Sequence, residues 1–183
     1  MKIDNNDSII EELEQYDYLS DNFEEKFISK YYPLVGLFTF KFSYLEHSLN
    51  MVIADYISDR EHESGYLILQ SLYFRNKIEL FNRIFIRLSK FNRRKTFKEK
   101  IKSLNSRLEK LNKFRNSIAH ANWCSLDESG FVRTKIILDE EDASIKFKKV
   151  KMDLITIRKN IKEIDALINK LYTVNEQAYQ FFK

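Results

Sequence analysis

Apolar residues recur every three or four positions along most of the chain, which is the period of a helix with one buried face. One such stripe predicts a helix over residues 33–58, with Pro33 at a position suited to a first helical turn. Two more stripes predict helices over residues 67–91 and 95–120. A fourth begins after Asp153, a good N-cap, and runs to about residue 181.

The apolar period changes between the third and fourth predicted helices. Residues 131–138 and 145–150 are rich in β-branched and aromatic side chains that partly alternate with polar ones, which predicts a small hairpin or three-stranded flap. Residues 123–126 are a candidate edge strand. Gly65 is expected to mark a break between helices, and residues 92–95 a turn. The predicted fold is therefore mainly α: a helical bundle of four long helices with a small β-hairpin inserted before the last helix.

The N-terminal segment does not share this pattern. Residues 1–30 are acidic, and we expect a loose arm or a short helix in which Asp7 or Ser8 caps residues 9–16. Residues 31–183 are expected to form one helical-bundle domain, since 183 residues suit a single domain.

Composition removes several classes of protein. The chain has 3 Gly and 1 Pro, too few for a turn-rich β-sandwich or a glycine-loop dinucleotide fold. Cys124 is the sole cysteine, which excludes an intramolecular disulfide and a zinc site built on several thiolates. The histidines lack metal-ligand spacing, so we predict no metal site and no cofactor. An N-terminus without an apolar core, and no run of about 20 apolar residues, predict a cytoplasmic protein without a membrane partner.

Charge is distributed very unevenly. The formal net charge is +4. Residues 1–74 carry 5 Lys and Arg against 14 Asp and Glu, whereas residues 75–115 carry 15 against 3. A concentrated cationic segment is typical of proteins that bind polyanions. The alternative is that the acidic N-terminal third neutralises this segment inside the fold.

One charged residue interrupts the apolar stripe of the third predicted helix. The stripe passes through Leu111 and Ile118, and the position that would complete it between them is Arg115. On an ideal helix Arg115 lies about 40° from Leu111 and about 60° from Ile118. A guanidinium there needs a carboxylate partner or a wet cleft. Glu46 is the candidate partner, so both a structural ion pair and a functional site remain open.

The residues after Arg115 add chemistry to this position. Asn116 and His120 are four residues apart and share a helix face. His120 comes near the predicted helix end, where the helix dipole favours an imidazolium. Arginine, amide and imidazole together can hold a phosphate and move a proton.

This arrangement resembles the motif of the HEPN superfamily, in which an arginine is followed, four to six residues later, by a histidine near the end of a bundle helix. The order of Glu46, Lys77 and the motif, then a hairpin and a long last helix, is also similar and covers roughly residues 33–183. The resemblance implies a metal-independent ribonuclease of prokaryotic toxin or antiviral type. Arg115, His120 and Asn116 would be the catalytic residues, with Asn116 orienting His120 or the phosphate, and Glu46 would support Arg115.

Partners follow from the chemistry and the charge. Cleavage of RNA by its own 2′-OH needs a base and an acid, and one chain offers one motif histidine, so we expect a homodimer with Arg115 near its axis. Lys77, Arg94, Lys110 and Lys113 of the basic segment are the expected RNA-binding residues. A cognate antitoxin would be a further partner. The alternative function is a non-catalytic HEPN-like dimerisation, adaptor or nucleic-acid-binding module.

Overall fold

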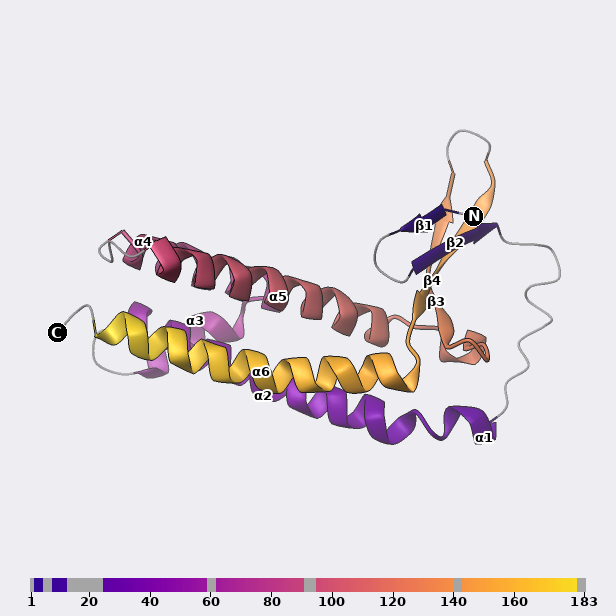
Figure 1. Cartoon of the computed structure of the whole chain (residues 1–183), viewed down its shortest axis with the longest axis horizontal. Helices are drawn as coiled ribbons and strands as arrows, with labels where there is room; N and C mark the ends of the chain where they lie inside the picture. The colour runs from indigo at the N-terminus through magenta and orange to yellow at the C-terminus, as the bar shows by residue number, and fades with distance from the viewer. Residues whose placement is uncertain are drawn as a thin grey trace. The chain divides into compact units, whose positions relative to one another are not determined.

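The computed structural model describes residues 2–4, 8–12, 25–58, 62–90, 95–139 and 143–180, and these are mainly helical with one small antiparallel sheet (Figure 1). The elements in chain order are β1 (Lys2–Asp4), β2 (Ser8–Glu12), α1 (Glu25–Ile28), α2 (Tyr32–Ile57), α3 (His62–Gln70), α4 (Phe74–Leu88), α5 (Lys95–Ala119), a 3₁₀ turn (Trp123–Ser125), β3 (Phe131–Leu138), β4 (Ile145–Lys151) and α6 (Leu154–Tyr179). The expected helices over 33–58, 95–120 and from Asp153 onward are confirmed as α2, α5 and α6.

The chain divides into two compact units. The sheet unit comprises residues 1–38 and 114–160, and the helical unit comprises residues 39–113 and 161–183.

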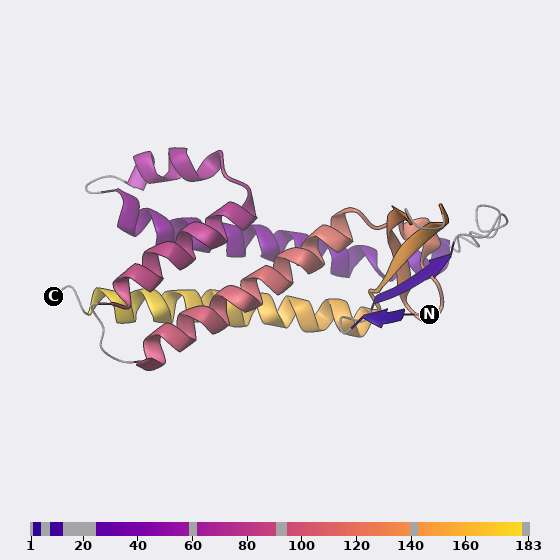
Figure 2. The ribbon, with the colours of Figure 1, turned by 90° about the horizontal axis from the view of Figure 1, so that it is seen from above.

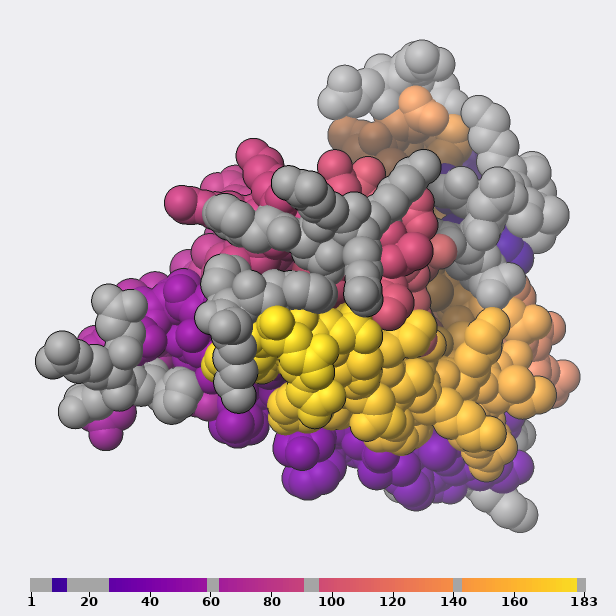
Figure 3. Space-filling model, turned by 60° about the vertical axis from the view of Figure 1, so that its left-hand side comes forward, coloured from indigo at the N-terminus to yellow at the C-terminus, as the bar shows by residue number. Residues whose placement is uncertain are grey.

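The helical unit is built from amphipathic helices whose apolar stripes meet in a core. Its fully buried side chains come from every long helix of the unit: Leu45, Leu49, Ile53, Leu69, Ile78, Phe81, Phe85, Ile101, Leu104, Leu108, Leu111, Ile164, Leu167 and Leu171. Figure 3 shows α6 lying along α2 at the surface. Lys41 of α2 pairs there with Asp165 of α6 at 2.6 Å, and the Tyr56 hydroxyl donates to Asn175 Oδ1 at 2.8 Å.

The expected second helix over residues 67–91 is corrected to two helices, α3 and α4, separated at residues 71–73. Figure 2 shows α3 and α4 as two separate helices with a bend between them. Gly65, expected to be a break, lies inside α3. A Cβ at Gly65 would meet the Cβ of Ala54 at 3.1 Å, so the glycine permits close packing of α3 on α2. The turn expected at residues 92–95 falls outside the described residues, apart from Lys95 at the start of α5.

The sheet has four antiparallel strands in the order β1-β2-β4-β3. The expected hairpin is confirmed: β3 and β4 match the predicted strands at residues 131–138 and 145–150. The expected helix at residues 9–16 is wrong for residues 9–12, because β2 pairs with β4 from Ser8↔Val150 to Glu12↔Lys146. The expected edge at residues 123–126 is instead a 3₁₀ turn, although Asn122 forms an isolated bridge with Arg133.

The hairpin is joined to α6 by a closely packed corner. Gly130 adopts φ +81°, and a Cβ there would meet the Asp153 Cβ at 2.7 Å. Asp153 caps α6 as predicted, because its Oδ1 accepts from the Thr156 N–H at 2.6 Å. Burial raises the pKa of this carboxyl, but hydrogen bonds from Thr156 and the charge of Lys151 outweigh it, so the pKa is lowered overall.

Candidate active site at the end of helix α5

The last turn of α5 is held in the sheet unit by aromatic contacts on both sides. Phe114 packs edge-on against Phe38 of α2, with 5.4 Å between ring centroids. Just past the helix, the Trp123 ring lies 6.0 Å from that of Tyr31. Arg115, Asn116 and His120 all lie between these two anchors, so packing fixes the backbone from which the three side chains project.

Arg115 reaches sideways around the helix. Its side chain is half-buried, and Nη1 donates a hydrogen bond to Asn116 Oδ1 at 3.1 Å. Asn116 lies about 100° around the helix from Arg115, and His120 about 40° further in the same direction. The contact therefore turns the guanidinium away from the apolar stripe and toward the face that carries His120.

His120 ends the regular helix with its side chain exposed to solvent. Its N–H donates to Asn116 O at 3.0 Å, a normal α-helical bond, and only the next bond, from Ala121 N to Ile118 O at 3.4 Å, tightens to a 3₁₀ step. The helix therefore does not loosen before His120. Since Asn116 is exposed as well, the amide and the imidazole both face solvent and can contact a large ligand.

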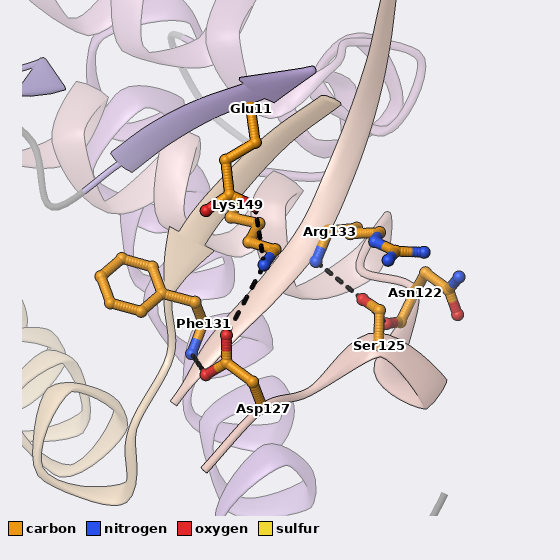
Figure 4. Close-up of polar contacts among 7 residues, drawn as sticks. All are labelled: Glu11, Asn122, Ser125, Asp127, Phe131, Arg133 and Lys149. Carbon is orange, nitrogen blue, oxygen red and sulfur yellow. Dashed lines mark hydrogen bonds and ion pairs between the residues drawn. The ribbon is translucent and has the colours of Figure 1, made fainter. Parts of the chain in front are cut away.

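The segment after His120 is fastened to the hairpin (Figure 4). Asn122 N–H donates to Arg133 O at 2.8 Å, and Arg133 N–H donates to Ser125 Oγ at 2.9 Å. Asp127 Oδ1 accepts from the Phe131 N–H at 2.9 Å, and Lys149 lies 3.8 Å from the second oxygen of Asp127. The motif and strand β3 are thus parts of one hydrogen-bonded structure.

Glu46, the expected support of Arg115, has a different observed partner. Lys77 Nζ lies 2.5 Å from Glu46 Oε1, and the Lys77 side chain is only 5% exposed. This location corrects the expectation that Lys77 contacts RNA, because its ammonium is buried and already paired. The pairing of Glu46 with Arg115 stays a prediction.

Two of the other three expected RNA-binding residues lie at the surface, and the third is outside the described residues. Lys110 and Lys113 are exposed on α5, as contact with a polyanion requires, and Arg94 lies outside the described residues. Tyr31, whose ring packs beside that of Trp123, is 4% exposed and belongs to the core. Burial raises the pKa of the Tyr31 phenol, and the carboxylates of Asp153 and Asp127 raise it further.

The residues of the described ranges support neither a metal site nor a membrane-spanning helix. No three side chains among His, Cys, Asp and Glu gather there closely enough to hold a metal ion. Cys124 is exposed as a free thiol. No described helix is both long and apolar enough to cross a membrane.

The hairpin carries a second group of cations, which the net charge of this region does not reveal. Strands β3 and β4 carry six Lys or Arg residues and no Asp or Glu: Arg133, Lys135, Lys146, Lys148, Lys149 and Lys151. The acidic residues that surround the strands in the sequence make the regional net charge nearly zero, which hides this concentration. A count restricted to the two predicted strands would have found it.

Comparison with known proteins gives no relative: no protein-family model, no curated protein and no solved structure matches this chain.

Proposed function

We propose that this chain is a HEPN-like endoribonuclease, with four long helices and an inserted hairpin, that cuts RNA without a metal ion. It would act in the cytoplasm as a toxin or antiviral effector. The observation that carries the proposal is the hydrogen bond from Arg115 to Asn116, since it directs a guanidinium toward the solvent-exposed face that carries His120. A cation, an amide and an imidazole on one helix end are groups that phosphodiester cleavage can use.

The proposed reaction uses the 2′-OH of RNA as the nucleophile. A histidine removes the 2′-OH proton while the oxygen attacks the adjacent phosphorus, and the bond from phosphorus to the 5′-oxygen breaks. A second histidine gives a proton to the leaving 5′-oxygen. Arg115 balances the negative charge that builds on the phosphate oxygens, and Asn116 orients Arg115. The products end in a 2′,3′-cyclic phosphate and a 5′-hydroxyl.

Two histidines imply two copies of the chain, since each contributes one His120. A surface of the helical unit supports self-association. On α2, Phe40, Tyr44 and Met51 share one face and are 74%, 53% and 41% exposed. Exposed apolar stripes of this kind mark interaction surfaces, and a symmetric dimer would bury the same stripe of each copy.

We expect RNA cleavage to persist in excess EDTA and to leave 2′,3′-cyclic phosphate ends. The reason is that the proposed groups are all side chains of the chain itself. The measurement is a gel assay with a 5′-labelled single-stranded RNA, followed by mass spectrometry of the fragments. An otherwise identical oligonucleotide with a 2′-deoxy residue at the cleaved position is the control and should stay intact. Activity that is lost with chelator and returns with magnesium would refute the mechanism.

We also expect a homodimer at tens of micromolar, measured by light scattering. Replacing Phe40, the most exposed residue of the α2 stripe, with Glu places a charge on this surface and should shift the chain toward monomer. Ser103→Glu, at an exposed position of α5, changes the net charge by the same amount and is the control. A wild-type chain that is monomeric at these concentrations would count against a composite site. A dimer without cleavage would favour the adaptor function.

A further inference from the structure

The cations of the hairpin divide into those with a partner and those without. Lys146 pairs with Asp139 at 2.6 Å, and Lys149 with Glu11 of β2 at 2.9 Å. Lys151 lies 3.8 Å from Asp153. Arg133 places its guanidinium carbon 4.7 Å from the centre of the Phe147 ring. These four cations are therefore used within the fold.

The remaining two cations face each other across the ladder. Lys135 of β3 pairs in register with Lys148 of β4, and neither ammonium has an ion-pair partner within the described part of the chain. Side chains directly opposite on antiparallel strands have Cβ atoms about 5 Å apart, and like charges there are destabilising. On the other side of Lys148, β2 presents Ile10, whereas Glu11 and Glu12 lie opposite Phe147 and Lys146.

A β-bulge produces this juxtaposition. The register shifts between Arg133 and Lys135, so that Arg133 lies opposite Lys149 and Lys135 opposite Lys148. The extra residue, Thr134, donates its hydroxyl to Lys148 O at 3.2 Å, which satisfies the interrupted ladder. Because one residue is added, Lys135 faces the opposite side of the sheet from Arg133. The backbone irregularity thus brings together two like charges that a regular ladder would keep apart.

We propose that Lys135 and Lys148 form a docking site for the sugar–phosphate backbone of single-stranded RNA. The inference rests on the proposed function, since the identity of the polyanion comes from the motif in the same unit. Strand β3 is fastened to the segment after His120 through Arg133, Ser125 and Asn122, so RNA held on the hairpin is held by the structure that carries His120. Phosphate contacts of this kind position a strand without reading its sequence.

The test measures binding without cleavage. The full-length chain is titrated against a fluorescent, fully 2′-O-methylated single-stranded RNA, which lacks the attacking 2′-OH, at several salt concentrations. The variant is Lys135→Gln/Lys148→Gln. The control, Lys159→Gln/Lys162→Gln, removes the same charge from exposed positions of α6.

If each lysine neutralises one phosphate, the slope of log affinity against log salt becomes shallower by about 1.4 in the Lys135/Lys148 variant, and affinity at 0.1 M salt falls on the order of tenfold. The control should match the wild type.

Equal losses in the two double variants would overturn the site, as would a wild type that does not bind. If the double variant is unfolded by circular dichroism, Lys135→Gln alone, at an exposed position, should lose about half of that slope change, and an unchanged slope overturns the site. Pair-dependent binding by a chain that never cleaves ordinary RNA would reject the ribonuclease proposal and leave this site standing.

Discussion

Replacing His120 with Ala or Arg115 with Leu is expected to lower the rate of RNA cleavage by about 10²–10⁴-fold. His120 is the proposed proton carrier, and Arg115 the cation that balances charge on the phosphate. The expected effects on stability differ. His120 is exposed at the helix end, so its loss should change the free energy of unfolding little. Arg115→Leu completes an apolar stripe between the buried Leu111 and Ile118 and should raise stability by about 1 kcal/mol. Single-turnover cleavage and thermal melts measure the two quantities.

Two further variants test the roles assigned to Arg115 and Asn116. Asn116→Ala removes the acceptor of the Arg115 hydrogen bond, and an intermediate loss of activity would show that Asn116 positions the guanidinium. Arg115→Lys keeps a charge but not the planar fork that binds two phosphate oxygens, so partial activity is expected. A large loss of stability in Arg115→Leu would instead identify Arg115 as half of a structural ion pair.

Replacing Glu46 with Leu is expected to destabilise the chain by about 3–5 kcal/mol, since it leaves the buried ammonium of Lys77 without its carboxylate. Lys77→Met should cost less, because the Glu46 side chain is 29% exposed and can be hydrated. The double variant should cost less than the sum of the single variants, because neither charge is then stranded. Urea denaturation followed by circular dichroism measures all three.

The exposed pair of Lys41 of α2 and Asp165 of α6 provides a control for the buried pair. Its side chains are 30% and 52% exposed, so Asp165→Leu should cost no more than about 1 kcal/mol. If Glu46→Leu is as mild as Asp165→Leu, Lys77 is not held by Glu46.

The helices were predictable where apolar periodicity was long and unbroken, as in α2, α5 and α6. The division between α3 and α4 was not, because the apolar pattern continues through Leu72 and Tyr73 while the helix ends locally. Leu72 N–H bonds to Leu69 O at 3.1 Å, and the Ser71 hydroxyl donates to Ile68 O at 2.8 Å. The role of Gly65 was not predictable, because in a sequence a glycine that lets a neighbouring helix approach closely cannot be distinguished from one that ends a helix.

Pairings between distant segments were the least predictable. Ser8-Ile-Ile-Glu-Glu suits a capped helix start as well as a strand, and the partner β4, far away in the chain, decides in favour of the strand. Likewise, the sequence leaves open whether the Glu46 carboxylate pairs with Lys77 or with Arg115, since both cations lie on other helices. One local signal was present: Lys77 shares the buried stripe of Phe74, Ile78 and Phe81, which argues against an exposed role.

For the candidate site, the sequence supplied the residue types and their angular spacing but not the side-chain direction. An ideal helix separates Arg115 and His120 by about 140°. The sideways reach of Arg115 to Asn116 depends on a rotamer, which spacing does not determine. The hairpin cations depend on the bulge at Thr134, and a single extra residue in a ladder leaves no mark in an alternating pattern.

The central position of β4 in the sheet has a consequence for the order of folding. Its partner β2 precedes it by about 140 residues, so this pairing closes one of the longest loops the chain allows and should form late. At synthesis rates of about 5–20 residues per second, β2 leaves the ribosome on the order of ten seconds before β4 exists. During that interval β2 is a short strand without its partner. The like charges of Glu11 and Glu12 would oppose pairing between nascent chains during that interval, before Glu11 joins Lys149 in the finished sheet.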